Sequence, residues 1–173
     1  YALESQIKHH ELPKDNLVEI GPRDGEHLIR EEDILQKIKE LGDELALIMI
    51  GGVNYYTGQL HNLEAITNAA HEVGAFCGFD LAHAAGNIPL NLHDLGVDFA
   101  CWCTYKYINS GPGSVGGIFI HEKHHNSGLP RLEGWWGHDK ETRFKMSPDY
   151  ISIGTAESWQ MSNAPVFNMA IHN

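Results

Sequence analysis

The sequence predicts an α/β domain in which a mostly parallel sheet is layered with helices on both faces. Short runs of β-branched and aliphatic residues alternate along the chain with segments in which apolar residues recur at helical spacing. One of these runs, Leu45–Ile50, is almost wholly apolar, as expected for a parallel strand that is covered on both faces. This alternation of strand and helix is typical of βαβ units.

Turn-forming residues, above all glycine, separate the predicted elements. The helices that we expect are Tyr1–His10, about Arg30–Leu41, and Asn62–Val73. The strands that we expect are Leu17–Ile20, Leu45–Ile50, Ala75–Phe79, Asp98–Cys103 and Gly117–His121. After Pro130 the pattern weakens, and we expect loops and short elements up to Asn163.

The composition argues against several classes of protein. The 173 residues are 42% hydrophobic and 20% charged, which fits one ordinary globular domain. No apolar run reaches the roughly 18 residues that a membrane span needs, and no basic segment followed by an apolar one opens the sequence. The net charge of -11 argues against a nucleic-acid surface, which needs clustered positive charge. We expect neither membrane nor nucleic-acid partners.

The three cysteines, Cys77, Cys101 and Cys103, all lie in apolar runs, where free cysteine behaves as a small buried hydrophobe. Cys101 and Cys103 should share one face of a strand, a spacing that fits neither a redox motif nor a zinc pair. We therefore expect a reducing compartment.

Polar side chains that are capable of chemistry follow three of the predicted strands. In open α/β sheets ligands bind at the carboxyl ends of the strands. Asp80 and His83 follow one strand, Lys106 lies between Tyr105 and Tyr107 after the next, and residues 54–58 follow an earlier one. Burial of Lys106 there would favour the neutral amine, which attacks a carbonyl to form an imine. Each residue alone also fits a helix cap or a solvated surface position, so their joint placement is what favours a site.

Around these residues the chain resembles the kynureninases, within the fold type I family of pyridoxal-phosphate enzymes. The resemblance extends over nearly the whole chain. An aspartate and a lysine alone are generic to fold type I, whereas Trp-Gly-His at 136–138 and Arg-Phe-Lys-Met at 143–146 point to kynureninases. The segments that carry the resemblance are 56–59, 78–84, 96–103, 105–107, 134–138 and 142–146.

The resemblance implies that residues 1–173 are part of the cofactor-binding large domain of such an enzyme, with the N-terminal and C-terminal portions of the parent protein absent. It implies a pyridoxal 5'-phosphate-dependent hydrolase that cleaves the Cβ–Cγ bond of L-kynurenine or its 3-hydroxy form. The products would be L-alanine and anthranilate or 3-hydroxyanthranilate, in tryptophan catabolism and NAD biosynthesis. It also implies a cytoplasmic homodimer whose subunits share the site, and we expect the fragment alone to be inactive.

The same resemblance implies roles for individual residues. Lys106 matches the lysine that holds the cofactor as a Schiff base and moves a proton at the substrate Cα. Asp80 matches the carboxylate that keeps the pyridine nitrogen protonated. His83 matches a cofactor-pocket histidine, and Tyr105 matches a tyrosine at the phosphate that can also act as acid or base. The remaining pocket residues implied are Trp135 and Asn163.

One position departs from the family's pattern. Gly51 stands where the phosphate-binding serine of the family is expected, so a side-chain hydroxyl is missing there. The backbone N–H groups of Gly51 and Gly52 are the remaining candidates for phosphate contact, because glycine permits close approach.

Two short motifs match other kinds of site in the wrong context. His121–His125 fits the zinc-peptidase pattern H-E-x-x-H, which requires a helix, but it ends a predicted strand. Gly111, Gly113 and Gly116 fit a dinucleotide-binding pattern, but they lead into a strand rather than a helix. We expect no metal site.

Two other functions stay open. A different fold type I activity, such as a cysteine desulfurase or an aminotransferase, would need Lys106 but not the segment 135–138. A catalytically inactive fragment that only binds a partner would show no absorbance band of a bound cofactor.

Overall fold

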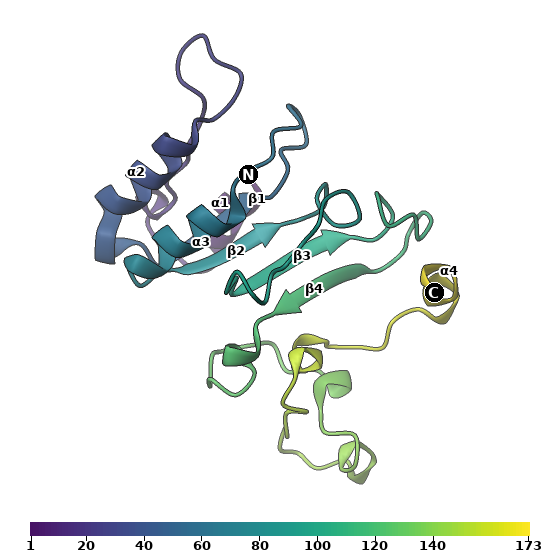
Figure 1. Cartoon of the computed structure of the whole chain (residues 1–173). Coiled ribbons are helices and arrows are strands. Elements are labelled where there is room, and N and C mark those ends of the chain that lie inside the picture. The colour runs from purple at the N-terminus through teal and green to yellow at the C-terminus, as the bar shows by residue number, and fades with distance from the viewer.

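The computed structural model describes residues 1–173 and contains four α-helices and one four-stranded sheet (Figure 1). None of the helices combines the length and apolar character that crossing a membrane requires. The helices are α1 (Ala2–His9), α2 (Glu31–Leu41), α3 (Leu63–Glu72) and α4 (Val166–His172). The strands are β1 (Leu47–Gly51), β2 (Phe76–Asp80), β3 (Phe99–Cys103) and β4 (Gly116–Ile120).

The sheet has the order β1-β2-β3-β4. The first three strands are parallel, and β4 runs antiparallel to β3. In the register, Asp80 lies between Gly51 of β1 and Cys101 of β3. The predicted α/β class with a mostly parallel sheet is therefore confirmed, and the carboxyl ends of β1, β2 and β3 meet at one edge.

Helix α3 packs on one face of the sheet and α2 packs on α3, because each helix has an apolar stripe. Ile34 and Ile38 of α2 and Ile66 of α3 are buried in one cluster with Cys77 and Phe79 of β2. The opposite face remains partly open, with exposed fractions of 49% for Leu47, 41% for Phe76 and 48% for Ile118. Of the three layers expected, these residues build the sheet and one helical layer.

The expected strand at Leu17–Ile20 is wrong. This segment is irregular extended chain that follows a 3-10 turn at Lys14–Asn16 and pairs with no strand. Val18 is 47% exposed, and Ile20 packs against the core. A short β-branched run looks the same in the sequence whether or not a neighbouring strand offers hydrogen bonds.

Residues 125–163, here called the C-terminal lobe, form short 3-10 turns, as expected for the chain after Pro130. The lobe lies beyond the end to which β4 points, whereas the loops after β2 and β3 lie at the opposite end (Figure 1). Within it, the Tyr150 hydroxyl donates to the carbonyls of Gly137 and Ser158 at 2.9 and 3.2 Å. Helix α4 then returns to the loop after β3, where His172 Nδ1 lies 2.7 Å from Ser110 Oγ.

Candidate active site

The turns after β2 and β3 bring His83 and Lys106 into contact. The Nζ atom of Lys106 lies 2.9 Å from Nε2 of His83, and both side chains are half-buried. Which of the two nitrogens donates depends on the ring nitrogen of His83 that carries the proton. Two residues that lie on different strand ends thus form one polar pair.

The turn that carries Lys106 is closed by hydrogen bonds. The Ser110 N–H donates to Thr104 O at 3.0 Å, and the Asn109 N–H donates to Lys106 O at 3.0 Å. Thr104 is buried, and its hydroxyl lies 2.7 Å from Ser114 Oγ. Asn109 has a φ of 60°, a conformation that asparagine tolerates better than most residues. The backbone around Lys106 is therefore held in one arrangement.

The turn after β2 approaches the Lys106 turn closely because residue 86 is glycine. Gly86 has a φ of 79°, and a Cβ atom there would meet the carbonyl carbon of Tyr107 at 2.9 Å. The His83 ring lies edge-on to Tyr107 with the ring centroids 6.1 Å apart. The contact between the two turns thus depends on a missing side chain.

Asp80 ends β2 at the same edge of the sheet, and its side chain is exposed. Its Oδ1 accepts from the Ala82 N–H at 2.9 Å, which leaves Oδ2 able to accept from a ligand. On the neighbouring strand, burial raises the pKa of Cys101, with further contributions from Asp80 and Cys103. A neutral thiol therefore lies beside the carboxylate.

Tyr105 is 51% exposed next to Lys106, whose Nζ lies 6.0 Å from the centre of the Tyr105 ring. A hydrogen bond with Cys103 raises the pKa of Tyr105. The phenol therefore keeps its proton at neutral pH and can donate it.

The backbone after β1 offers fewer free N–H donors for an anion than its two glycines predict. The Gly52 N–H donates to Asp80 O at 2.9 Å, so of the two candidate N–H groups this one is already engaged within the sheet edge. A Cβ at Gly52 would also meet Leu81 Cδ2 at 2.6 Å, so this glycine serves close packing of the chain. After it, Asn54 Oδ1 accepts from the N–H groups of Tyr56 and Thr57 at 2.9 and 3.0 Å.

Trp135 does not lie at this edge. It begins the turn Trp135–Gly137 of the C-terminal lobe, which Figure 1 shows beyond the other end of the sheet. Asn163 precedes α4, and its side chain contacts its chain neighbours Ser162 and Ala164. Trp135 is 46% exposed, and Asn163 is also exposed. Within one chain the sequence-predicted residues thus form two groups, with Asp80, His83, Tyr105 and Lys106 in the first.

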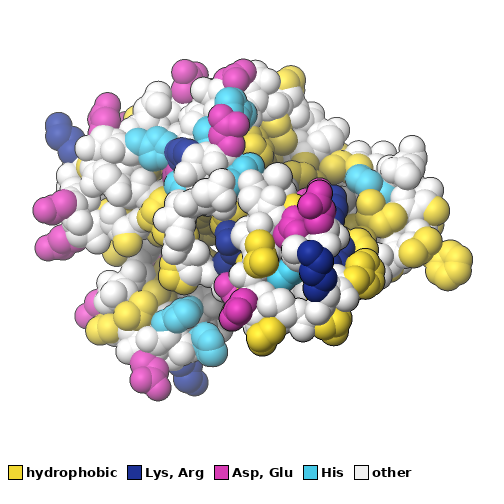
Figure 2. All heavy atoms as spheres, turned by 90° about the horizontal axis from the view of Figure 1, so that it is seen from below, with side chains coloured by type: hydrophobic (Ala, Val, Ile, Leu, Met, Phe, Trp, Pro, Cys, Tyr) yellow, Lys and Arg dark blue, Asp and Glu magenta, His cyan; other side chains and the backbone are white.

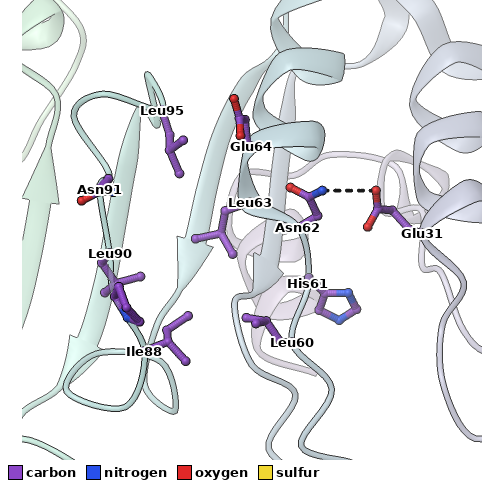
Figure 3. A pocket seen from close by; sticks show the side chains of 11 residues that line it. Glu31, Leu60, His61, Asn62, Leu63, Glu64, Ile88, Leu90, Asn91 and Leu95 are labelled. Carbon is purple, nitrogen blue, oxygen red and sulfur yellow. Dashed lines mark hydrogen bonds between the residues drawn. The ribbon is translucent and has the colours of Figure 1, made fainter.

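A separate pocket of about 440 Å³ lies between the start of α3 and residues 88–95, and none of the predicted site residues lines it (Figure 3). Asn62 caps α3, since its Oδ1 accepts from the Ala65 N–H at 3.1 Å, and its amide donates to Glu31 at 3.4 Å. Burial lowers the pKa of the lining residue His61. No motif in the sequence marks this pocket.

The histidines of the H-E-x-x-H segment are engaged within the fold. His121 stacks on His93 with ring centroids 4.8 Å apart, and His125 Nε2 lies 3.1 Å from the Ile120 carbonyl oxygen. Between them, His124 Nε2 lies 2.7 Å from Oδ1 of Asp98. Asp98 is only 3% exposed, and it also bonds His71 at 2.8 Å. The segment therefore fixes the return from β4 to the start of β3.

The carboxylate of Asp98 is surrounded by donors. Lys123 Nζ and the Cys77 N–H each lie 2.7 Å from it. Burial by itself would raise the pKa of Asp98, but the hydrogen bonds from Lys123, from the Cys77 backbone and from the two histidines lower it well below its ordinary value.

Sequence reasoning assigned no role to Arg143, which the structure buries beside Trp135 and Trp136. The only sequence signal was an arginine seven residues after the second of two adjacent tryptophans. That pattern does not predict burial, because arginine is usually exposed.

The aminotransferase class-V family matches residues 11–153, a range that includes the His83–Lys106 pair and the Trp135 turn. The chain belongs to the aminotransferase class-V family. In the terms of this family, the pair and Asp80 lie in the matched region, whereas α4 lies outside it.

Curated relatives of this class-V chain are kynureninases. It is 59% identical over 172 residues to the kynureninase of Flavobacterium psychrophilum, with 98% of this chain and 40% of that protein covered. It is 55% identical to the kynureninase of Myxococcus xanthus over the same shares. The mouse kynureninase is 52% identical, with 96% of this chain and 36% of that protein covered. The chain thus spans about 40% of the length of its first relatives.

Solved structures support the class-V fold. An apo cysteine desulfurase from Thermococcus onnurineus superposes with a TM-score of 0.64 at 24% identity, over 90% of this chain and 36% of that one. The cystine C-S lyase C-DES gives a TM-score of 0.65 at 22% identity, over 81% of this chain and 36% of that one. At these identities the likeness shows the fold alone.

Proposed function

We propose that the protein containing this chain is a kynureninase, a pyridoxal-phosphate-dependent hydrolase of L-kynurenine or 3-hydroxykynurenine. The observation that carries the proposal is the contact between Lys106 and His83 at the strand edge that also holds Asp80. The identity of 59% to a curated kynureninase supports the substrate class. Residues 1–173 would form part of the cofactor-binding large domain.

The donor set at this edge fits pyridoxal phosphate. A primary amine suits its aldehyde, and a carboxylate with one free oxygen suits its pyridine nitrogen. When bound, the cofactor supplies an electron sink for cleavage of the Cβ–Cγ bond. Its phosphate would need donors other than the Gly52 N–H, which Asp80 O already binds.

Four residues of this chain would then have separate roles in binding and proton transfer. Lys106 would bind the cofactor aldehyde and later move a proton at the substrate Cα, while His83 orients the amine from 2.9 Å. Asp80 Oδ2 would hold the proton of the pyridine nitrogen. Tyr105, whose pKa is raised, would donate a proton near the substrate carbonyl as a general acid.

The separation of Trp135 from Lys106 supports a homodimer with a shared site. In a two-fold dimer, the C-terminal lobe of each copy can meet the Lys106 edge of the other. Figure 2 views the molecule from below with respect to Figure 1, and it shows hydrophobic side chains on the surface of that face. Large apolar side chains in the lobe that are at least 46% exposed are Leu132, Trp135, Phe144, Met146, Ile151 and Met161.

The free thiols of Cys77, Cys101 and Cys103 support a reducing compartment, and we propose the cytoplasm.

The test uses the complete protein, purified with pyridoxal phosphate and reduced with borohydride. We expect mass spectrometry to find the reduced cofactor on Lys106, and L-kynurenine to yield fluorescent anthranilate. Lys106→Ala should abolish both, whereas Lys39→Ala, at an exposed position on α2, should change neither. Label on Lys106 without anthranilate would point to a desulfurase or aminotransferase, and absence of label would point to an inactive binding protein.

A further inference from the structure

Arg143 is a buried cation that has no carboxylate partner. Its side chain belongs to the 3-10 turn Arg143–Lys145 in the C-terminal lobe, and the residue is only 7% exposed. Its Nη2 donates to the carbonyl oxygens of Trp136 and His138, the latter at 3.0 Å, while Nε has no hydrogen-bond partner. Burying a charge whose hydrogen bonds go only to backbone carbonyls costs free energy, so stability alone does not account for this placement.

The guanidinium lies against both tryptophans of the turn Trp135–Gly137. Its Cζ is 5.2 Å from the ring centroid of Trp135 and 4.6 Å from that of Trp136. The Trp135 Nε1–H points back to the Arg143 carbonyl at 3.4 Å, a long contact that adds to the stacking. A planar cation that stacks and donates at once fits this place better than an ammonium group would.

Besides the two hydrogen bonds from Arg143, the backbone of the turn is held by contacts that do not involve this side chain. A Cβ at Gly137 would meet the carbonyl oxygen of Ser158 at 2.8 Å and the hydroxyl of Tyr150 at 2.9 Å. These contacts seat the turn on the neighbouring segment, but they do not touch the Trp135 ring. Trp135 remains 46% exposed, with Phe144 edge-on at 5.3 Å and itself 78% exposed. What holds the indole from the interior is Arg143.

We propose that Arg143 is a positioning residue that holds the Trp135 indole in the orientation in which the C-terminal lobe presents it to the cofactor. This inference rests on the proposed function, in which Trp135 contributes to a shared cofactor site. An exposed indole without an inner anchor would sample several rotamers, and fixing it on binding would cost conformational entropy. Arg143 removes that cost before the cofactor binds, so the proposal predicts that its effect on cofactor binding passes through Trp135.

The experiment is a double-mutant cycle in the complete protein. Arg143→Met removes the charge, and Arg143→Lys keeps it but loses the planar stack, so a second variant remains if the first does not fold. We expect either change to raise the Kd for pyridoxal phosphate roughly tenfold, as losses of supporting contacts around a bound group do. In a Trp135→Ala background the same changes should alter that Kd by less than about twofold, since coupled residues are not additive.

A matched control is available in the same lobe. Arg131 stacks on Trp159, with Cζ 4.9 Å from the ring centroid, and Trp159 is not a predicted site residue. Arg131→Lys should leave the Kd for pyridoxal phosphate unchanged. An equal rise in Kd with and without Trp135 would overturn the proposal, because Arg143 would then act by another route.

Near-ultraviolet circular dichroism separates this inference from the proposed function. The neighbouring Trp135 and Trp136 rings, with centroids 6.1 Å apart, should give a signal without any cofactor. Arg143→Lys should reduce this signal, whereas Arg131→Lys should not. A wild-type protein that binds no cofactor, yet loses this signal in Arg143→Lys, would overturn the proposed function and support the anchoring of Trp135. An unchanged signal would overturn the anchoring itself.

Discussion

The amine of Lys106 and the ring of His83 lie 2.9 Å apart although the residues are 23 positions apart in the chain. Each residue follows a different strand, so the distance between them is set by the pairing of β2 with β3 and by two turns. The amine is thereby directed by a neighbour on the sheet rather than by its own flexible stem. Changes at His83 or in either turn should therefore disturb the position of the Lys106 amine.

Replacing His83 with alanine should lower activity without unfolding the protein. The half-buried ring orients Lys106, and misplacing a reacting group by about 1 Å can cost on the order of 10²-fold in rate. We expect kcat/KM for L-kynurenine to fall by roughly that factor, measured by anthranilate release. His93→Ala, at a side chain that is 59% exposed, is the control. Equal activity of the two variants would remove His83 from the site.

Replacing Asp80 with asparagine tests charge with little change in shape. The variant keeps an oxygen that can accept from the Ala82 N–H, so the turn after β2 should persist. The proton on the pyridine nitrogen would lose its anionic partner, and we expect kcat to fall by at least about 10²-fold while cofactor still binds. Steady-state kinetics and equilibrium binding of pyridoxal phosphate measure the two effects. Wild-type turnover in this variant would leave Asp80 with a structural role alone.

Adding a methyl group at Gly86 should disturb the contact between the two turns. Gly86 and Gly25 have φ values of 79° and 80°, but only the Cβ at Gly86 would meet another segment, at Tyr107. The left-handed conformation costs either alanine variant about 1 kcal/mol, so the difference between them isolates the contact. We expect Gly86→Ala to lose more stability in denaturant and to lose kynureninase activity, whereas Gly25→Ala keeps its activity. Matching losses in both would show that the close approach is unimportant.

The elements that the sequence predicted well are those whose apolar pattern matches their burial. Leu45–Ile50 has the pattern of a buried strand because most of β1 is partly covered, and the period of α2 reflects the burial of Ile34 and Ile38 in the core. The run Leu17–Ile20 fails because propensity does not say whether a partner strand is present.

The candidate site divides in the same way. Residues that follow strands could be grouped from sequence, because parallel strands share one carboxyl edge. The position of Trp135 could not, since no rule of spacing predicts how the C-terminal lobe folds back after an antiparallel β4. The burial of Arg143 was equally hidden, because it depends on tryptophans that surround it only in three dimensions.

The last prediction concerns Asp98, at the end of the sheet away from the site. Its carboxylate is 3% exposed and bonds His71 from α3, the Cys77 N–H and, after β4, both Lys123 and His124. Removing one partner of a buried charged network costs several kcal/mol, so we expect Asp98→Asn to lose roughly 3 kcal/mol in the free energy of unfolding at pH 7. The comparison is Asp94→Asn, at a side chain that is 83% exposed, which should change stability by less than about 0.5 kcal/mol.

The pH dependence gives this prediction a sign. The pKa of Asp98 is lowered in the folded state, while that of an aspartate in an unfolded chain is about 3.9. Its contribution is therefore fully present above about pH 4 and is lost as the pH falls toward the folded-state value, because the unfolded chain takes up the proton first. The stability gap between wild type and Asp98→Asn, measured by denaturant titration at a series of pH values, should be largest near neutrality and shrink below about pH 4. A gap that stays constant into acid would mean that the asparagine disrupts packing and that the charge of Asp98 contributes little.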